Sequence, residues 1–245
     1  MPKKYKDALF AKKQKTGDFV FDKKVTEVFD EMLVRSVPFY GEIQRMIAEL
    51  ARTFAQPGTA VYDLGCSTGT TMVNVIKALR DKNVKVIGVD NSPHMLAVAK
   101  RRLEHQKLWD RAELQEADLN QPFPLGRPSV VILVLTLQFI RPAQRELLIQ
   151  NIFQSLRKGG VVIVVDKVLG NDSLTTRLFI EKYYAFKARQ GYSRLEIARK
   201  REALENVLIP YRLEENLMML RRSGFPVTDT FFTWYNFAGI LGIKQ

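Results

Sequence analysis

Glycines and acids gather at the ends of three apolar stretches of this 245-residue chain. The segment VYDLGCSTGT, residues 61–70, is apolar at first and continues as a loop of small residues from Gly65 to Gly69. Such glycines remove side chains where a ligand has to touch backbone. The next apolar stretch ends on Asp90, where an acid can accept hydrogen bonds from two ribose hydroxyls. A third ends on Asp118, where an acid can meet an adenine amino group. These residues favour an adenosine-containing ligand.

The spacing of the glycines excludes two common nucleotide sites. Gly65 and Gly69 are separated by three residues, which differs from the Gly-x-Gly-x-x-Gly pattern of dinucleotide sites. No Gly-Lys-Ser/Thr follows, so the segment is not a P-loop. A glycine loop alone equally fits a tight turn between a strand and a helix. Because Asp63, Asp90 and Asp118 lie at the ends of three successive predicted strands, we interpret the loop as a ligand site.

Apolar runs of strand length alternate with segments of helical period in the middle of the chain. We expect strands at residues 60–65, 84–90, 112–118, 129–136 and 160–168, and helices at 70–80, 93–105 and 142–156. The strands are apolar almost throughout, which is typical of strands buried on both faces of a parallel sheet. This alternation predicts a doubly wound α/β fold, in which ligands bind beyond the carboxyl ends of the strands.

The segments outside this alternation are helical in pattern and are expected to cover the sheet. We predict one ligand-binding domain over residues 19–245, with a helical N-terminal cap at 19–54 and a helical insertion at 171–222, both as lids. The C-terminal segment 227–244 completes the sheet. A basic tail, residues 1–18, precedes the domain.

The charge of the chain is strongly positive. The formal net charge is +12, from 38 Lys and Arg against 26 Asp and Glu, which favours anionic partners. Part of the excess lies in the basic tail, and the rest is spread over helical stretches without interleaved stacking aromatics. We therefore expect a solvated basic surface rather than a direct nucleic-acid surface.

The few cysteines and histidines of the chain limit which cellular compartment and which kinds of catalytic or metal site fit the sequence. The single cysteine, Cys66, excludes an internal disulfide and fits a reducing compartment. No stretch approaches the roughly 20 apolar residues of a membrane span, and the lysine-rich start does not have the pattern of a secretory signal. We expect a cytoplasmic protein. His94 and His105 lie 11 positions apart and make no metal pair, so we expect no metal. A catalytic cysteine needs a nearby histidine, and the chain has only these two, so we expect Cys66 to contact a ligand through its backbone.

The glycine loop with acids at three strand ends resembles the class I S-adenosylmethionine (SAM)-dependent methyltransferase superfamily over residues 55–245. A closer resemblance takes in nearly the whole chain. The carboxy-S-adenosyl-L-methionine synthase family is similar in FDKKVTEVFDEMLVRSVPFY, VYDLGCSTG, VIGVDNSPHML, TLQFI, ARQGYSRLEIARKREALENVL and YNFAG. RSVPFY and GYSRLEIARKREALENVL are the specific segments, since neither is needed to make the fold. The resemblance implies a Rossmann-like fold with a mostly parallel seven-stranded sheet.

The resemblance also implies an unusual transfer reaction. Members of this family carry a carboxyl group from prephenate to the methyl group of SAM, and prephenate leaves as phenylpyruvate. Aromatisation of prephenate releases carbon dioxide and hydroxide. The hydroxide takes a proton from the methyl group, whose carbon then captures the carbon dioxide. The protein would supply positioning, exclusion of water and a cation for the carboxylate. A tRNA carboxymethyltransferase uses the product to modify the wobble uridine, and direct tRNA binding by this chain is not expected.

The resemblance assigns site residues position by position. The expected contacts to SAM or carboxy-SAM fall on Tyr40, Gly65, Cys66, Ser67, Asp90, Asn91, Asp118 and Leu119. The catalytic, carboxylate-binding residue falls on Arg201, which in the family reaches into the neighbouring subunit of a homodimer. A guanidinium suits this task because it can hold a carboxylate through two parallel hydrogen bonds.

One position departs from the family pattern. The fourth strand ordinarily carries an asparagine where this chain has Val134, so one polar contact to the cofactor is missing. Losing such a hydrogen bond costs about 1 kcal/mol net. Either Thr136 or a water replaces it, or the site has been retuned.

Residues of the insertion also have plainer interpretations. Arg199, Lys200 and Arg201 are consecutive, so on a helix we expect only one of them to face a given site. Taken alone, the triplet is typical of a solvated face. Packing in the core or lid is expected for four aromatic residues at near-helical spacing: Tyr183, Tyr184, Phe186 and Tyr192.

The sequence is compatible with three functions. The first is a carboxy-SAM synthase. The second is a SAM-dependent methyltransferase of a small anionic or tRNA-linked acceptor, and the third is a non-catalytic nucleotide-binding or tRNA-associated protein, suggested by the charge. Arg201 separates the first two, because a simple methyltransferase has no use for a cation facing a neutral methyl group.

Overall fold

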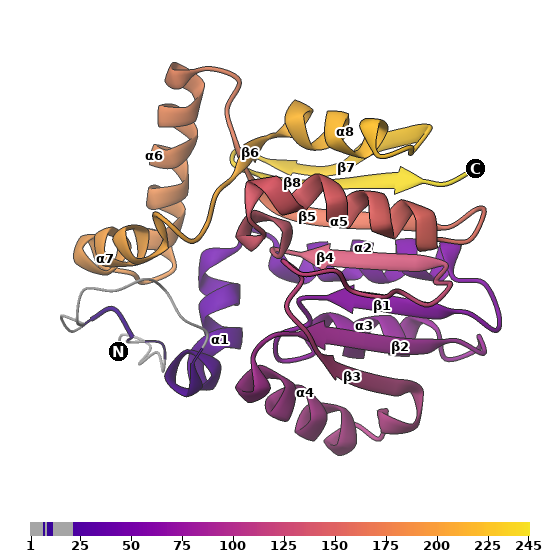
Figure 1. Ribbon diagram of the computed structural model, residues 1–245. Helices are drawn as coiled ribbons and strands as arrows, with labels where there is room; N and C mark the ends of the chain where they lie inside the picture. Colours follow the sequence, from indigo (N-terminus) through magenta and orange to yellow (C-terminus); the bar gives the residue numbers. More distant parts are fainter. Residues whose placement is uncertain (1–6, 8, 12–21) are drawn as a thin grey trace.

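The computed structural model, which describes residues 7, 9–11 and 22–245, is built around one twisted sheet (Figure 1). Most of the predicted basic tail, residues 1–18, lies outside this described part. The main strands have the order β3-β2-β1-β4-β5-β8-β7. Their bounds are β1 Ala60–Leu64, β2 Lys85–Asp90, β3 Ala112–Glu116, β4 Val130–Val134, β5 Val161–Leu169, β7 Val227–Trp234 and β8 Phe237–Ile243.

The pairing of the strands confirms the predicted doubly wound α/β sheet. Strands β1 to β5 are parallel, and β8 runs antiparallel to both β5 and β7. Seven strands follow this order, as expected, and an eighth, β6 (Tyr211–Arg212), pairs with the end of β5. Two residues are too few to show a periodicity, so the sequence pattern does not reveal β6. The central strands β4 and β5 are apolar and buried almost throughout, as parallel strands covered on both faces must be.

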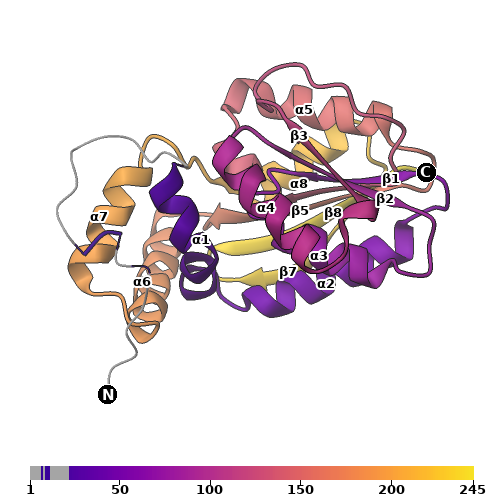
Figure 2. The ribbon, with the colours of Figure 1, turned by 90° about the horizontal axis from the view of Figure 1, so that it is seen from below.

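Helices cover both faces of the sheet (Figure 2). On one face lie α2 (Tyr40–Phe54), α3 (Thr70–Ala78) and α4 (Pro93–His105); on the other lie α5 (Pro142–Ser155) and α8 (Leu213–Arg222). Each helix places an apolar stripe in one of two buried clusters, separated by the sheet. Short 3-10 turns precede β3 and α5.

Three further helices stand beyond one end of the sheet: α1 (Lys23–Ser36), α6 (Ser173–Arg189) and α7 (Arg194–Leu204) (Figures 1 and 2). Only part of each expected lid, 19–54 and 171–222, is therefore a lid, because α2 and α8 lie on the sheet. Periodicity shows that a helix has an apolar face but not which surface covers that face. None of the helices in the described ranges is long and apolar enough to cross a membrane.

Side-chain caps define where these three outer helices begin. Asp22 accepts a hydrogen bond from the backbone N–H of Val25 at the start of α1. Asp172 begins a capping box at α6, and Ser193 begins another at α7 that Glu196 closes. Each cap pairs backbone donors that a first turn leaves without intrahelical partners, which stabilises a helix by about 1 kcal/mol.

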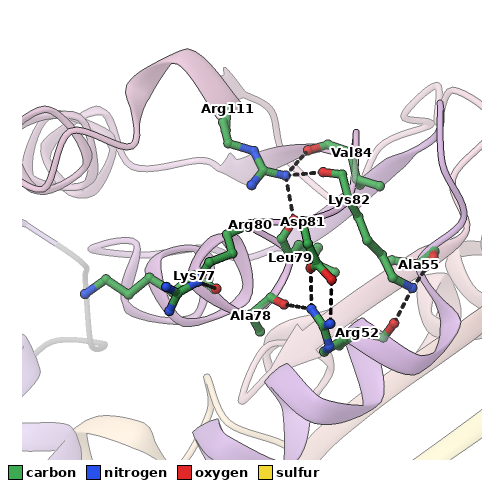
Figure 3. Close-up of polar contacts among 10 residues, drawn as sticks. All are labelled: Arg52, Ala55, Lys77, Ala78, Leu79, Arg80, Asp81, Lys82, Val84 and Arg111. Carbon is green, nitrogen blue, oxygen red and sulfur yellow. Dashed lines mark hydrogen bonds and ion pairs between the residues drawn. The ribbon is translucent and has the colours of Figure 1, made fainter.

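Charged side chains cap backbone carbonyls at the end of the sheet where β1 and β2 begin (Figure 3). Arg111 donates hydrogen bonds to three carbonyls that follow α3, and Lys82 donates to two at the end of α2. Arg52 forms an ion pair with Asp81 beside them. Helix ends leave such carbonyls without intrahelical partners, so these cations satisfy them. The opposite end of the sheet carries the residues with functional potential.

Candidate functional site

The loop after β1 has a backbone conformation that favours glycine. Gly65 and Gly69 have φ angles of +78° and +80°, in the left-handed region. A Cβ at Gly65 would lie 2.3 Å from the hydroxyl oxygen of Thr136. The backbone N–H groups of Gly65 and Cys66 both donate to the carbonyl of Val89, at 2.7 and 2.9 Å, which anchors the loop to β2. Glycine is required at position 65 both for its φ angle and for this close approach.

Asp90, at the end of β2, is joined to the same loop. Its carboxylate accepts hydrogen bonds from the backbone N–H groups of Ser67 and Ser92, both at 2.9 Å. Burial raises the pKa of Asp90, and these backbone hydrogen bonds oppose the rise. The carboxylate has lone pairs beyond these two bonds, so it can also accept from ligand hydroxyls.

Asp63, inside β1, lies behind this surface. Its side chain is buried, and one carboxylate oxygen has no hydrogen-bond partner among the described residues. Burial raises the pKa of Asp63 to about 7, and the negative charge of Asp90 adds to the rise. Asp63 does not border the cavity at this end of the sheet, so its effect on a ligand would be electrostatic rather than by contact.

A cavity of about 350 Å³ opens at the carboxyl ends of the parallel strands, bounded by α1, α6 and α7. This is the edge at which doubly wound folds bind ligands, and the volume suits a small molecule. All the residues that the resemblance assigns to SAM or its carboxylate border this cavity: Tyr40, Gly65, Cys66, Ser67, Asp90, Asn91, Asp118, Leu119 and Arg201. Their contact with a ligand stays a prediction.

Tyr40 reaches the cavity from the junction of α1 and α2. Phe39 turns the chain there with a φ angle of +54°, and Tyr40 is the first residue of α2. Burial raises the pKa of the Tyr40 hydroxyl, and the charges of Asp30 and Asp63 add to the rise. The hydroxyl therefore stays protonated and can donate a hydrogen bond. Asp30 also forms an ion pair with Arg102 of α4, which holds α1 over the strand ends.

The segment RSVPFY packs against the insertion through Arg35. The Arg35 side chain is buried and donates hydrogen bonds to the carbonyls of Gln190 and Asp7, at 3.0 and 2.9 Å. Its guanidinium lies 3.9 Å from the centre of the Tyr192 ring, and the Tyr192 hydroxyl donates to the Asp7 carboxylate. The two segments that carry the specific resemblance are thus physically joined.

The third strand ends earlier than its sequence pattern predicts. β3 stops at Glu116, so Asp118 lies in the loop beyond it. Asp118 is exposed, and one of its carboxylate oxygens accepts hydrogen bonds from the backbone and side-chain amides of Asn120, both at 2.9 Å. The neighbouring Leu119 is buried and offers an apolar surface to the same cavity.

Val134 borders the cavity without a polar group to offer. The hydroxyl of Thr136 donates to the backbone carbonyl of Val134 at 3.2 Å, and this uses its only proton. Thr136 therefore does not supply the hydrogen-bond donor that an asparagine at position 134 would carry.

The Cys66 thiol is in the wrong environment for a nucleophile. Burial raises its pKa well above the ordinary value, and the charges of Asp63 and Asp90 raise it further. A thiol that stays protonated is a poor nucleophile, which favours the expected backbone role. His94 and His105 are exposed near the two ends of α4. No group of three His, Cys, Asp or Glu side chains among the described residues could hold a metal, and the expected absence of a metal stays a prediction.

The expectation that only one of residues 199–201 faces a given site is wrong. Lys200 and Arg201 both border the cavity, Lys200 buried and Arg201 exposed. The Lys200 ammonium donates a hydrogen bond to the hydroxyl of Ser36 at 2.9 Å. Arg199 instead donates to two backbone carbonyls near the N-terminus. Neighbouring helix positions differ by about 100°, and the cavity extends far enough around α7 to meet two of them.

Some aromatic residues of the insertion only pack against other side chains, whereas others also border the cavity. Phe186 packs edge-on against Trp234, with ring centres 5.5 Å apart, as expected of a lid residue. Tyr192 packs against Arg35. Tyr183 is buried and packs as predicted, but it also borders the cavity, as does Tyr184.

Sequence reasoning missed two lysines at this site and misassigned a third. Lys167, Lys187 and Lys200 all border the cavity, and the last was interpreted as part of a solvated face. A usable signal was present for Lys167, which interrupts the otherwise apolar run VVIVVDKVL of β5. Lysine is almost never buried without a partner, so a lysine in a buried run indicates a site.

Comparisons with known proteins agree with this geometry. A family model described as a methyltransferase domain matches residues 61–160. A carboxy-S-adenosyl-L-methionine synthase from Methylococcus capsulatus is 51% identical over 93% of this chain and 94% of its own length. Another from Desulfotalea psychrophila is 42% identical over 98% of this chain and 97% of its own. The solved structure of an O-methyltransferase family protein from Burkholderia thailandensis has a TM-score of 0.71 at 16% identity, over 98% of this chain and 63% of that one.

The strand order, the glycine loop and the matched domain define a class I SAM-dependent methyltransferase fold, and the protein is a SAM-dependent transferase. The structural neighbour establishes the fold alone, whereas the curated relatives match nearly the whole chain. Within the superfamily, the chain belongs to the carboxy-S-adenosyl-L-methionine synthase family. This confirms the resemblance identified from the sequence.

Proposed function

We infer that this protein makes carboxy-SAM and phenylpyruvate from SAM and prephenate. The position of Arg201 carries the proposal, because it borders the same cavity as the residues expected to hold SAM. A guanidinium can hold a carboxylate on the methyl carbon through two charge-assisted hydrogen bonds. In a simple methyl transfer, the methyl group carries no negative charge with which the guanidinium could pair. The 51% identity to a relative named for this activity supports the same conclusion.

In this proposal, SAM lies along the ends of β1, β2 and β3. Asp90 accepts hydrogen bonds from the ribose hydroxyls, while Asp118 and Leu119 meet the adenine. The loop from Gly65 to Ser67 contacts the ligand through its backbone. The 2.9 Å hydrogen bond between Ser67 and Asp90 supports this arrangement, because it holds two of the contacting elements together.

The proposed reaction balances without a base from the protein. Prephenate loses its ring carboxylate as carbon dioxide and its ring hydroxyl as hydroxide, which leaves phenylpyruvate. The hydroxide accepts one proton from the SAM methyl group and becomes water. The methyl carbon bonds to the carbon dioxide, and Arg201 pairs with the carboxylate so formed. The protein contributes orientation, exclusion of water and this cation.

A variant at Arg201 tests the role that separates synthase from methyltransferase. Arg201→Ala is expected to bind SAM with unchanged affinity and to lose nearly all production of carboxy-SAM, read by mass spectrometry. Arg194→Ala, at an exposed position of the same helix, is the matched control and should keep full activity. Full activity in Arg201→Ala with release of S-adenosylhomocysteine would instead favour methyl transfer to a small anionic or tRNA-linked acceptor.

We also propose a cytoplasmic homodimer. Arg201 borders the cavity of its own subunit, and in the dimer its guanidinium pairs with the carboxylate either there or in the cavity of the neighbouring subunit. The exposure of Arg201 on α7 supports this, since an exposed side chain can reach a second chain. Mixing Arg201→Ala with Asp90→Ala subunits would restore one complete site per mixed dimer if the arginine acts across the interface. No recovery would place Arg201 in its own subunit's site. The product would supply a tRNA carboxymethyltransferase, without direct tRNA binding by this chain.

A further inference from the structure

Three lysines from three separate elements meet at the cavity. Lys167 comes from β5, Lys187 from α6 and Lys200 from α7. Lys187 and Lys200 are only 4% and 7% exposed. The ammonium groups of Lys167 and Lys187 lie 4.9 and 4.7 Å from the centre of one ring, that of Tyr183. Three lysine amines therefore share a small, largely buried volume.

Among the described residues, none of the three lysines has an acid as an ion-pair partner. Asp7 acts on Lys200 only from a longer distance and is itself paired with Arg35. The contacts that the structure shows for their ammonium groups are neutral: the rings of Tyr183, Tyr184 and Tyr192 and the hydroxyl of Ser36. Neutral contacts replace only part of the hydration that an ammonium group loses on burial.

Burial and mutual repulsion disfavour the charged forms. Burial lowers the pKa of Lys187 to about 6, and the charges of Lys200 and Lys167 lower it further. Burial also lowers the pKa values of Lys167 and Lys200 to about 8. Like charges withdrawn from water destabilise a folded protein unless they bind an anion, and perturbed groups of this kind cluster at functional sites.

Aromatic faces accompany the three charges. Tyr183, Tyr184 and Phe237 border the same cavity, and the rings of Tyr183 and Phe237 meet edge-on with centres 5.3 Å apart. Such surfaces pack against a flat carbon ring, while ammonium groups bind carboxylates. The combination fits a ligand that joins a carbon ring to more than one anionic group.

We propose that Lys167, Lys187 and Lys200 form the binding site for the carboxyl donor, recognised as a ring-containing dicarboxylate dianion. The identity of that dianion as prephenate rests on the proposed function above. The lysines hold the donor, and Arg201 holds the carboxylate after it has reached the methyl carbon. When the ring carboxylate leaves, the donor fragment keeps one negative charge instead of two. The lysines then bind it less tightly, which helps its release.

The test compares binding of two ligands to matched lysine variants. Lys187→Met and Lys167→Met remove the charge and keep the length of the side chain. Lys182→Met, at an exposed position of α6 outside the cavity, is the control. Calorimetry near neutral pH gives the affinity for SAM. It then gives the affinity for prephenate of protein saturated with S-adenosylhomocysteine, which lacks the methyl group and therefore cannot react. We expect both cavity variants to bind prephenate at least tenfold more weakly and SAM unchanged, with the control equal to wild type in both.

Proton uptake gives a readout that a structural role would not change. Because Lys187 is mostly neutral near pH 7 and an anion favours its charged form, binding of prephenate should draw a proton from the buffer. The measured enthalpy should therefore change with the ionisation enthalpy of the buffer, and this dependence should shrink in Lys187→Met. The melting temperatures of the free variants should equal or exceed that of wild type, since each variant replaces a largely buried amine without an ion-pair partner by an apolar side chain of similar length.

The outcomes separate this inference from the proposed function. Prephenate affinity within twofold of wild type in both cavity variants would overturn the inference, even if carboxy-SAM is formed. An equal loss of SAM affinity would also overturn it, because the lysines would then hold the carboxylate of SAM itself. Lysine-dependent binding of prephenate without any carboxy-SAM would leave the inference standing and refute the proposed function.

Discussion

The carboxylate of Asp90 accepts a hydrogen bond from the backbone N–H of Ser67 at 2.9 Å, so the acid at the end of β2 holds the loop that follows β1. A second hydrogen bond, from the N–H of Ser92, fixes the same carboxylate from the other side. The acid is therefore oriented by backbone rather than by a flexible partner. Preorganisation of this kind lowers the cost of binding a ligand that needs both the loop and the acid.

Substitution of Asp90 should weaken SAM binding. Asp90→Ala removes both the proposed acceptor for the ribose hydroxyls and the support of Ser67. Losing hydrogen bonds to a charged group costs about 2 kcal/mol, or roughly thirtyfold in affinity. Calorimetric titration with SAM checks this. Glu116→Ala, at the exposed end of β3, should bind SAM as wild type does. Equal affinities of the two variants would contradict the assigned role of Asp90.

Gly65 and Gly58 allow backbone strain to be separated from steric conflict. Both have positive φ angles, but a Cβ at Gly58 meets nothing within 4 Å, whereas one at Gly65 collides with Thr136. Gly58→Ala should lower the free energy of unfolding by about 1–2 kcal/mol. Gly65→Ala should lower it by at least about 2 kcal/mol more, because Thr136 must move. Urea denaturation measures both, and equal losses would show that the close approach to Thr136 is unimportant.

Much of the fold is predictable because buried parallel strands leave a direct pattern. The run VVIVVDKVL predicts β5 to within a residue, since a strand covered on both faces has to be apolar throughout. The position of α8 is not predictable in the same way, because an apolar stripe does not say which surface covers it. β6 leaves no pattern at all. Its two residues, Tyr211 and Arg212, pair with β5 only once the insertion has folded back.

The candidate site likewise contains residues that the sequence predicts and residues that it does not. Gly65 and Asp90 are recognisable because the chemistry of a nucleoside site fixes their types and their places at strand ends. Arg201 was found only through the resemblance. Lys187 and Lys200 lie on helices where lysine is normally a surface residue, and only the folding of α6 and α7 over the strand ends buries them together.

The stability of the protein should fall with rising pH through the titration of Asp63. The pKa of Asp63 is about 7 in the folded protein, against an ordinary value of 3.8. Between these two pH values the folded protein therefore keeps a proton that the unfolded chain has released. The raised pKa of Asp63 adds up to about 4 kcal/mol to the free energy of unfolding. This stabilisation is fully present below about pH 4 and is lost as the pH rises through about 7. Asp63→Asn should flatten this slope in urea denaturation, apart from what the buried Asp166 contributes. An unchanged slope would mean that Asp63 is already ionised in the folded protein.

Val134→Asn should strengthen SAM binding. Val134 borders the cavity with no polar group, and the only proton of the Thr136 hydroxyl is used by the Val134 carbonyl. An asparagine would add one hydrogen bond, worth about 1 kcal/mol or roughly fivefold in affinity. Calorimetry with SAM measures the change, and Val134→Leu serves as the apolar control. Weaker binding by the asparagine variant would show that the site has been retuned around the valine.

We propose above that a carboxyl group passes from prephenate to the methyl carbon of SAM in this cavity. The most direct measurement is the mass spectrum of the small molecules formed from SAM and prephenate labelled with carbon-13 in its ring carboxylate. We expect a SAM derivative that is heavier by one carboxyl group and carries the label, together with unlabelled phenylpyruvate. Unmodified SAM, or S-adenosylhomocysteine without any labelled SAM derivative, would contradict this proposal.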